Sequence, residues 1–251
     1  MFTKYGLREF AIYGFGVPGC GFMLAYLAWT WLPRFVPGPA GLIVAGVLGA
    51  LSLGWMLFNL NFFRDPPRTI PGDEFTVVSP ADGTVTDVGE REEPEYFKAK
   101  VQSLGIFLSV FDVHVNRAPL EGTVDYLQHK DGKYLDARHP DCSTLNESQN
   151  IGFKSIWGPR FLVRQITGLI ARRIVCPLKE GDKCGRGERF GMIKFGSRTE
   201  LYLDAAFEVE WKVKVGDKVK GGATVVAVIK KAGNVVSKHD LPVTSSALPW
   251  K

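Results

Sequence analysis

Two long stretches without a charged side chain lie near the N-terminus, and they constrain the fold more than any other feature. Residues 10–32 and residues 40–60 contain no Asp, Glu, Lys or Arg. Each stretch reaches the roughly 20 apolar residues that a helix needs to cross a bilayer. The segment between them, Pro-Arg-Phe-Val-Pro-Gly-Pro at residues 33–39, favours a tight turn. The sequence therefore predicts a hydrophobic helical hairpin over residues 1–60 that anchors the protein in a membrane.

Positive charges indicate how the hairpin is oriented. Two precede it, two follow it and one lies in its turn: Lys4, Arg8, Arg64, Arg68 and Arg34. Because positive residues tend to stay in the cytoplasm, we expect the rest of the chain on the cytoplasmic side of the cell membrane. The first stretch is too long for the apolar part of a secretory signal and lacks an evident cleavage site, which favours a retained anchor. A hairpin lying in the membrane plane, or packed as core helices, is the alternative.

From residue 61 onward, short runs of β-branched and aromatic residues alternate with Gly, Pro, Asn and Asp. This pattern is typical of strands joined by turns. We expect residues 61–251 to form one mainly β (α+β) domain, with a helix at residues 166–174, where apolar residues recur at helical spacing. The expected strands cover residues 75–78, 84–88, 105–110, 122–127, 161–163, 189–194, 200–203, 208–213 and 224–229.

Two segments of this domain are weakly alike. Residues 77–85 and residues 213–221 both show a strand pattern next to a polar turn that contains glycine. The second segment resembles the half-barrel of biotinyl and lipoyl carrier domains. This likeness implies a duplicated, lipoyl-like β-sandwich or barrel core, although a fold does not by itself define a function.

Charge and cysteine content exclude some partners. The net charge is +5 and the pI about 9.0, but the positive residues form no run typical of nucleic-acid binding. We therefore expect an anionic membrane surface as a partner and no nucleic acid. The four cysteines lack the spacing of a zinc site and the density of a disulfide scaffold. Because His129, His139 and His239 also lack a metal-ligand spacing, no metal is predicted.

The residues that indicate a chemistry lie in the run 189–203, which has the pattern of a strand, a Gly196-Ser197 break and a second strand. A Gly-Ser pair between strands is by itself an ordinary turn. With Phe195 before the pair and Arg198 after it, however, this run closely resembles the processing site of the short, type A phosphatidylserine decarboxylases of prokaryotes.

Three further motifs of this family occur in the same order, so the likeness spans nearly the whole chain. They are Asn-Phe-Phe-Arg-Asp-Pro-Pro-Arg at residues 61–68, Ser-Pro-Ala-Asp-Gly at residues 79–83 and Phe-Asp-Val-His-Val-Asn-Arg-Ala-Pro at residues 111–119. Several motifs in one order are more specific than any single motif. Relatives of the short class include archaetidylserine decarboxylases, so the lipid backbone, diacylglycerol or archaeol, stays open.

The resemblance implies a proenzyme that cuts itself between Gly196 and Ser197. The products are a beta chain, residues 1–196, and an alpha chain, residues 197–251, which stay associated. The serine hydroxyl attacks the preceding carbonyl, and elimination and hydrolysis then leave a pyruvoyl cofactor in place of the serine. This group forms a Schiff base with phosphatidylserine and accepts the electrons released as carbon dioxide leaves. The expected product is phosphatidylethanolamine.

Two residues match the catalytic residues of the family. Imidazole titrates near neutral pH, which suits His114 to take the proton of Ser197, and Asp82 is expected to hold the tautomer of that imidazole. Arg117 and Lys194 are candidate contacts to the substrate phosphate, because a phosphodiester anion needs cationic donors. Solvated surface charge is the alternative for both.

One element departs from the family pattern, and two other functions stay open. Residues 146–150, Asn-Glu-Ser-Gln-Asn, lack the Arg of the family's Asn-Glu-Arg-Asn element. A membrane-tethered carrier or adaptor would be modified on Lys218 and would use Ser197 only as a turn residue. A serine hydrolase would combine Asp82, His114 and Ser197, although the chain lacks a Gly-x-Ser-x-Gly elbow there.

Overall fold

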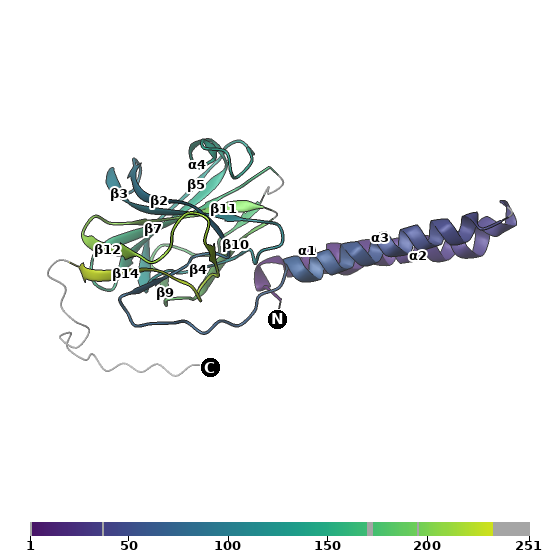
Figure 1. Ribbon diagram of the computed structural model, residues 1–251, viewed down its shortest axis with the longest axis horizontal. Helices are drawn as coiled ribbons and strands as arrows, with labels where there is room; N and C mark the ends of the chain where they lie inside the picture. The colour runs from purple at the N-terminus through teal and green to yellow at the C-terminus, as the bar shows by residue number, and fades with distance from the viewer. Residues whose placement is uncertain (1, 37, 170–172, 195, 233–251) are drawn as a thin grey trace.

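A long helical hairpin projects from one end of a β-rich domain (Figure 1). The structure is a computed structural model that describes residues 2–36, 38–169, 173–194 and 196–232. The two arms of the hairpin lie side by side, and the N-terminal residues lie where the hairpin meets the domain. The chain therefore comprises an extended apolar hairpin and a folded β part.

The first arm of the hairpin is helical from Lys4 to Arg34 and includes one π-helical segment, η2. A Cβ atom on Gly21 of this arm would overlap the hydroxyl of Ser52 on the second arm, so this glycine lets the arms approach closely. The helices are η1 (Lys4–Gly6), α1 (Leu7–Ala11), η2 (Ile12–Gly16), α2 (Val17–Trp31), η3 (Leu32–Arg34) and α3 (Ala40–Phe62).

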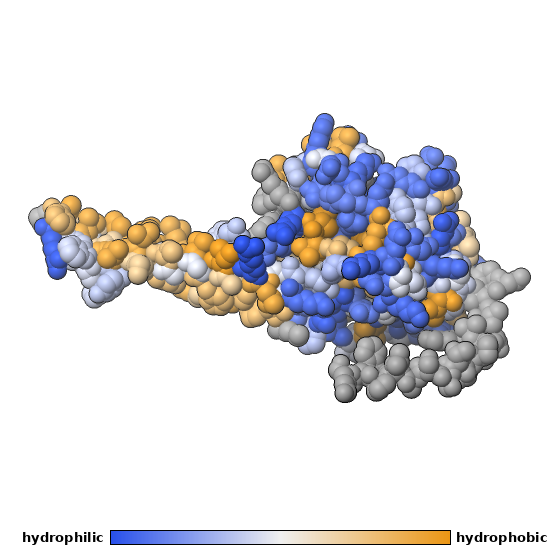
Figure 2. All heavy atoms as spheres, turned by 180° about the vertical axis from the view of Figure 1, so that it is seen from behind, coloured by the Kyte–Doolittle hydropathy of each residue, from blue (hydrophilic) through white to orange (hydrophobic). Residues whose placement is uncertain are grey.

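Both arms expose apolar side chains along their length (Figure 2). Met23, Leu42 and Leu51, for example, are 66%, 62% and 66% exposed. Lys4–Arg34 and Ala40–Phe62 are long and apolar enough to be candidate membrane spans. Exposed apolar surface of this extent marks contact with a membrane or a partner. The predicted hydrophobic hairpin is therefore confirmed, and it supports association with a membrane.

The base of the hairpin is packed against the β domain. Phe10, Phe62, Phe63 and Met192 form a buried apolar cluster, and Met192 belongs to strand β10 (Arg189–Lys194). The hairpin is thus fixed to the strand that precedes the glycine-serine junction.

Within the described residues, the β domain consists of three antiparallel sheets. The largest has the strand order β13-β2-β3-β11-β7-β6-β5-β9, and the two smaller sheets have the orders β1-β14-β12 and β4-β10-β8. The other elements are β1 (Thr76–Val78), β2 (Gly83–Glu93), β3 (Ala99–Leu108), β4 (Val115–Arg117), β5 (Gly122–Lys130), α4 (Cys142–Leu145), β6 (Ser148–Ser155), β7 (Arg160–Ile166), β8 (Arg173–Val175), β9 (Lys183–Cys184), β11 (Ser197–Leu203), β12 (Phe207–Trp211), β13 (Lys218–Val219) and β14 (Val225–Ala232).

Strand β11 lies within the largest sheet and is buried on both faces. It pairs with β3 along its whole length and with β7 from Arg198 to Leu203. Its side chains alternate, so Leu201 and Leu203 face the apolar core while Arg198 and Glu200 face a polar network. A strand buried on both faces has a strongly specified register.

The structure confirms the mainly β fold class, and every predicted strand is present. Strands β4, β6, β8, β9 and β13 were not predicted. The predicted helix at residues 166–174 is wrong, because Ile166 ends β7 and Arg173 begins β8, while residues 170–172 lie outside the described ranges. The ends of this segment pair with other strands instead. A short apolar run fits a strand as well as a helix, and periodicity alone cannot distinguish the two.

The two segments that look alike in sequence lie side by side. Lys218 pairs with Thr84, and the backbone N–H of Val85 donates to the carbonyl of Asp217 at 2.9 Å. The N–H of Gly216 donates back to the carbonyl of Val85 at 2.9 Å. This mutual pairing suits a lipoyl-like core, whose internal duplication stays a prediction.

Leu51→Lys tests whether the hairpin enters hydrocarbon. Leu51 lies midway along α3 and is 66% exposed, so a lysine has room there, but a charge at the centre of a spanning helix costs about 3 kcal/mol. We expect a smaller membrane-bound fraction in liposome flotation. Val215→Lys, at a 60% exposed site in the β domain, should leave that fraction unchanged. Undiminished flotation of Leu51→Lys would contradict insertion of α3.

Candidate active site

The glycine-serine junction lies where the chain passes from β10 to β11. Gly196 has a φ of 71°, in the left-handed region that favours glycine. Ser197 is the first residue of β11, is fully buried and pairs with Leu108 of β3. Its hydroxyl has no hydrogen-bond partner within the described residues, while Phe195 lies outside them. Because buried polar groups are almost always paired, an unpaired serine hydroxyl marks a candidate reactive group.

His114 contacts this junction through its ring. Its Nε2 accepts a hydrogen bond from the backbone N–H of Gly196 at 3.2 Å, and its Nδ1 lies 2.9 Å from the carbonyl oxygen of Asp112. Because Nε2 accepts, the ring proton is on Nδ1 and is donated to that carbonyl. The ring of Phe62 packs on the imidazole, with centroids 4.5 Å apart. The structure therefore brings His114 to the residue directly before Ser197.

Burial controls the protonation of His114. Its side chain is completely buried, and this desolvation, aided by the charge of Arg64 and opposed by the hydrogen bond to Asp112, lowers its pKa from 6.5 to about 4. The imidazole is therefore neutral at physiological pH, with a lone pair on Nε2. A neutral imidazole is the form that can accept a proton from a hydroxyl.

The carbonyl oxygen of Gly196 faces a second glycine, Gly168, in the loop after β7. A Cβ atom on Gly168 would overlap that oxygen and would lie 3.3 Å from the Cβ atom of Ala137. Space for the carbonyl group therefore depends on the absence of a side chain at position 168. If Ser197 attacked this carbonyl, the same oxygen would become negatively charged.

Asp82 has partners other than the predicted one. Its carboxylate accepts hydrogen bonds from Arg68 at 2.8 Å and from the backbone N–H of Gly221 at 2.7 Å. Within the described residues, no hydrogen bond joins it to His114, whose two ring nitrogens are both engaged elsewhere. Burial raises the pKa of Asp82, although Arg68 opposes the shift. The structure thus does not assemble the predicted aspartate-histidine pair, and Asp112 supplies the acceptor for the imidazole.

Arg117, a predicted phosphate contact, is held by protein groups. One Nη lies 3.0 Å from the carboxylate of Asp65 and 3.2 Å from the carbonyl of Pro66, and the other donates to the carbonyl of Gly187 at 3.1 Å. The residue is 5% exposed. Its guanidinium therefore joins the segment after the hairpin to β4.

Lys194, the other predicted phosphate contact, is also paired. Its Nζ lies 2.8 Å from the carboxylate of Glu9 in the hairpin, and the residue is 4% exposed. The same carboxylate lies 3.2 Å from a guanidinium nitrogen of Arg173 in β8. Lys194 therefore fastens the end of β10 to the base of the hairpin.

The motifs that carry the family resemblance contact one another in the fold. Three contacts join them: Asp65 to Arg117, Arg68 to Asp82, and the ring of Phe62 to that of His114. From the sequence, Arg64 and Arg68 of the motif at residues 61–68 were used only to orient the hairpin, and Asp65 was given no role. The sequence signal that could have indicated these ion pairs was the presence of opposite charges in separate motifs.

A hollow of about 400 Å³ opens beside Gly196. Phe107, Val110 and Leu169 give it apolar walls, and Arg138 with its ion-pair partner Asp136 contributes charge. A larger hollow of about 490 Å³ lies between β2, β3 and β12 and shares no residue with the junction. The hollow at Gly196 could not be predicted from the sequence, because its walls come from segments far apart in the chain.

Of the other histidines, the two that the structure describes lie outside this site. His129 and His139 leave 48% and 50% of their side chains exposed, and His239 lies outside the described residues. Within the described ranges, no three His, Cys, Asp or Glu side chains are grouped as metal ligands would be. The absence of a metal stays a prediction.

Known proteins match this chain over most of its length. The family model described as phosphatidylserine decarboxylase matches residues 55–227. A phosphatidylserine decarboxylase proenzyme of Carboxydothermus hydrogenoformans is 49% identical over 195 residues, which cover 74% of this chain and 91% of the relative. Those of Symbiobacterium thermophilum and Trichlorobacter lovleyi are 46% and 44% identical, covering 74% and 81% of this chain and 85% and 91% of the relatives.

The matched region begins in α3 and ends in β14, so it includes the glycine-serine junction and His114. The mainly β fold, the hydrophobic hairpin and these matches define an enzyme of phospholipid metabolism. The chain belongs to the phosphatidylserine decarboxylase family. The relatives are named proenzymes, a term for a chain made as a precursor.

The buried imidazole of His114 predicts a pH dependence of stability. Between its unfolded pKa of 6.5 and its folded pKa of about 4, the unfolded chain binds a proton that the folded chain does not. The free energy of unfolding of a Ser197→Ala chain should therefore fall as the pH drops from about 6.5 to about 4, by a total on the order of 3 kcal/mol.

Urea titrations at a series of pH values measure this loss, and the same chain with His114→Gln is the control. The control should show a flatter profile across that window. Equal slopes in the two chains would show that His114 titrates normally in the fold.

Proposed function

We propose that this protein converts phosphatidylserine to phosphatidylethanolamine with a pyruvoyl group made from its own Ser197. The observation that carries the proposal is the buried hydroxyl of Ser197, which has no hydrogen-bond partner among the described residues. It directly follows Gly196, whose N–H contacts the neutral ring of His114. Relatives named proenzymes support a precursor that is cut. Residues 1–60 are the proposed anchor and residues 61–251 the catalytic domain.

The cut begins with attack of Ser197 Oγ on the carbonyl carbon of Gly196. A C–O bond forms and the C–N bond between the two residues breaks, so that the amide becomes an ester and the nitrogen of residue 197 becomes an amine. His114 Nε2 takes the hydroxyl proton, once its hydrogen bond with the Gly196 N–H has given way, and returns it to the departing nitrogen. The absence of a side chain at Gly168 leaves room for the carbonyl oxygen during attack.

Elimination then completes the cut. Loss of the α-proton of residue 197 expels the Gly196 carboxylate and leaves dehydroalanine, whose imine tautomer is hydrolysed with release of ammonia. The products are chain 1–196 and chain 197–251, the latter beginning with the pyruvoyl group. Its carbonyl supplies an electrophile for the substrate amine and an electron sink when carbon dioxide leaves. The serine supplies all the carbon of this group, and water is the co-reactant.

The hollow beside Gly196 is the proposed entry for the lipid headgroup. Its apolar wall at Leu169 suits the glycerol and the first acyl carbons, and Arg138 offers a guanidinium whose side chain is 68% exposed. Arg117 and Lys194 are paired with Asp65 and Glu9 and are only 5% and 4% exposed, whereas the ion pair of Arg138 with Asp136 lies at the surface. We therefore assign the substrate phosphate to Arg138 rather than to them.

The hairpin explains how the enzyme meets a lipid substrate. Anchoring confines protein and phospholipid to one surface, which raises their effective concentration. The proposed location is the cell membrane with the β domain in the cytoplasm, because positive residues lie near the base of the hairpin: Lys4, Arg8, Arg64 and Arg173. The cut chains stay together in this proposal, since β11 pairs on both edges with strands of residues 1–196.

Family membership also supports this proposal over the two other functions that the sequence leaves open. The match to phosphatidylserine decarboxylase spans both Ser197 and Lys218. It supports a reactive residue at Ser197, as opposed to a carrier lysine at Lys218. The hypothesis of a serine hydrolase requires an Asp82–His114 pair. The partners of Asp82 are instead Arg68 and Gly221, which speaks against that hypothesis.

Ser197→Ala tests the proposed function. The substitution removes the nucleophile and opens no cavity of consequence, so the chain should fold, stay uncut and release no labelled carbon dioxide from carboxyl-labelled phosphatidylserine in mixed micelles. Ser148→Ala is the control, because Ser148 is also a buried first residue of a strand. It should retain cutting and turnover. Normal turnover by Ser197→Ala would falsify the proposal.

Gly168→Ala tests the geometry around the scissile carbonyl. The added methyl group would overlap the Gly196 oxygen, which belongs to the backbone and cannot easily move. We expect the rate of cutting to fall at least about tenfold, the effect of about 1.4 kcal/mol on a barrier, in pulse-chase gels. Gly185→Ala, whose Cβ atom would meet only Glu188 at 3.6 Å, should be cut normally. Normal cutting of Gly168→Ala would show that the carbonyl moves away from Gly168 before attack.

A further inference from the structure

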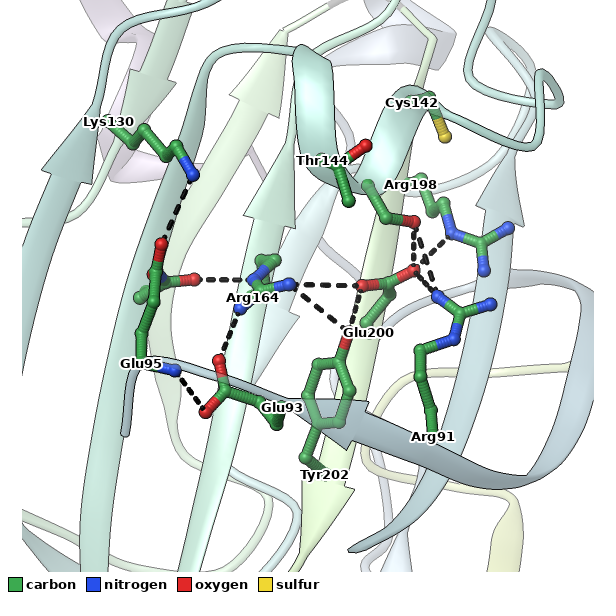
Figure 3. Close-up of polar contacts among 12 residues, drawn as sticks. Arg91, Glu93, Glu95, Lys130, Cys142, Thr144, Arg164, Arg198, Glu200 and Tyr202 are labelled. Atoms are coloured by element: carbon green, nitrogen blue, oxygen red, sulfur yellow. Dashed lines mark hydrogen bonds and ion pairs between the residues drawn. The ribbon is translucent and has the colours of Figure 1, made fainter. Parts of the chain in front are cut away.

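The face of β11 opposite Ser197 carries a buried network of charged side chains (Figure 3). Because side chains alternate along a strand, Arg198, Glu200 and Tyr202 point away from the side on which Ser197 lies. They are 6%, 1% and 1% exposed. Burying charge on a central strand is costly unless every group is paired, so this network needs a physical reason.

Glu200 is the centre of the network. Its Oε1 accepts hydrogen bonds from Arg198 at 2.7 Å and from Arg91 at 2.9 Å. Its Oε2 accepts from the Tyr202 hydroxyl at 2.6 Å and lies 3.9 Å from Arg164. Burial acts to raise the pKa of Glu200, but the three arginines outweigh it and lower the pKa to about 2. The carboxylate is therefore charged over the whole physiological range.

The arginines have other carboxylate partners, so the charges of the network balance. Arg198 is also paired with Asp87, and Arg164 lies 2.7 Å from Glu93. Arg164 donates in addition to the side-chain oxygen of Asn150 at 2.6 Å. The contacts in Figure 3 thus join β11 through its side chains to the adjacent strand β7 and, beyond its immediate neighbours in the sheet, to β2 and β6.

The network crosses the proposed cut. The three β11 side chains belong to the fragment that begins at residue 197, whereas Arg91, Arg164, Asp87 and Glu93 belong to residues 1–196. The ion pairs lie within one chain before the cut and join two chains after it. At that moment β11 acquires a free end at the modified residue.

A free strand end can shift, and the network opposes one particular shift. A slip of β11 by one residue would move every side chain to the opposite face. Residue 197 would leave the side on which the serine now lies, and Arg198 and Glu200 would enter the apolar core that Leu201 occupies. Main-chain hydrogen bonds with β3 and β7 could form in either register. The buried charges find partners on one face of the sheet but not on the other. This difference favours the native register.

We propose that the ion pairs of Glu200 with Arg91 and Arg164 lock the register of β11 after the cut and so position residue 197 for the substrate. This inference rests on the proposed function, because the free end that it fixes exists only after cleavage. Glu200 is a positioning residue, since it acts through the strand. In the precursor the lock matters less, because β11 is covalently continuous with β10.

Glu200→Gln in two backgrounds separates a register lock from a general structural role. Glutamine keeps the shape but removes the charge that the arginines share. In the uncut Ser197→Ala chain, we expect the amides of residues 198–203 to exchange hydrogen within about twofold of the rate without the substitution. In the cut enzyme the same amides should exchange at least about tenfold faster, and kcat should fall by a similar factor while KM is unchanged.

Glu210→Gln is the matched control. Glu210 also pairs with two cations, Lys212 and Lys230, but those pairs are exposed and lie within one fragment. It should alter neither exchange nor kcat. Arg91→Met, at the 36% exposed edge of the network, is a second variant in case Glu200→Gln does not accumulate, and the same contrast between backgrounds is expected.

Each other outcome overturns the lock. If amide exchange were accelerated equally in both backgrounds, the network would have a general structural role. If exchange in the cut enzyme were unchanged, the main-chain hydrogen bonds with β3 and β7 would suffice to hold β11. If neither variant were cut, the network would act before cleavage and not after it. A wild-type chain that stays uncut would overturn the proposed function itself, which distinguishes that failure from failure of the lock in a cut, active enzyme.

Discussion

The peptide bond between Gly196 and Ser197 joins two different sheets, and the site depends on how both sides of that bond are held. Before it, β10 lies in a three-stranded sheet with β4 and β8; after it, β11 is paired on both edges in the eight-stranded sheet. Gly196 makes the change of direction with a positive φ. His114 directly precedes β4, and Gly196 follows β10 of the same small sheet. This sheet therefore positions both the imidazole and the scissile carbonyl.

The membrane anchor and the site are parts of one structure. Phe62, in the last turn of α3, packs on the ring of His114, and Glu9 near the start of the first arm pairs with Lys194 at the end of β10. The apolar base of the hairpin helps to bury the histidine and so to keep it neutral. A chain anchored in this way would present the hollow beside Gly196 close to the level of the lipid headgroups.

The strands and the hairpin could be predicted from the sequence, because each depends on residues close together in the chain. Short runs of β-branched and aromatic residues indicated the strands, and the two long apolar runs indicated the hairpin. Strand β6 was missed because its Ser, Gln and Asn residues face other polar groups inside the fold, a choice that only tertiary pairing explains. Motif order singled out His114 and Ser197. It could not show that Asp82 pairs with Arg68, or that Arg117 and Lys194 are buried, because those contacts join distant segments.

The proposed chemistry requires that residue 197 become a ketone, and the intact mass of the mature wild-type protein measures this directly. We expect two species. One is residues 1–196 with an ordinary carboxyl terminus, and the other is residues 197–251, lighter by one ammonia than the same peptide beginning with serine, because a pyruvoyl group replaces the serine. Sodium borohydride should add two hydrogens to the smaller species. A single species with the mass of the whole unmodified chain, in a preparation that turns over phosphatidylserine, would contradict this chemistry.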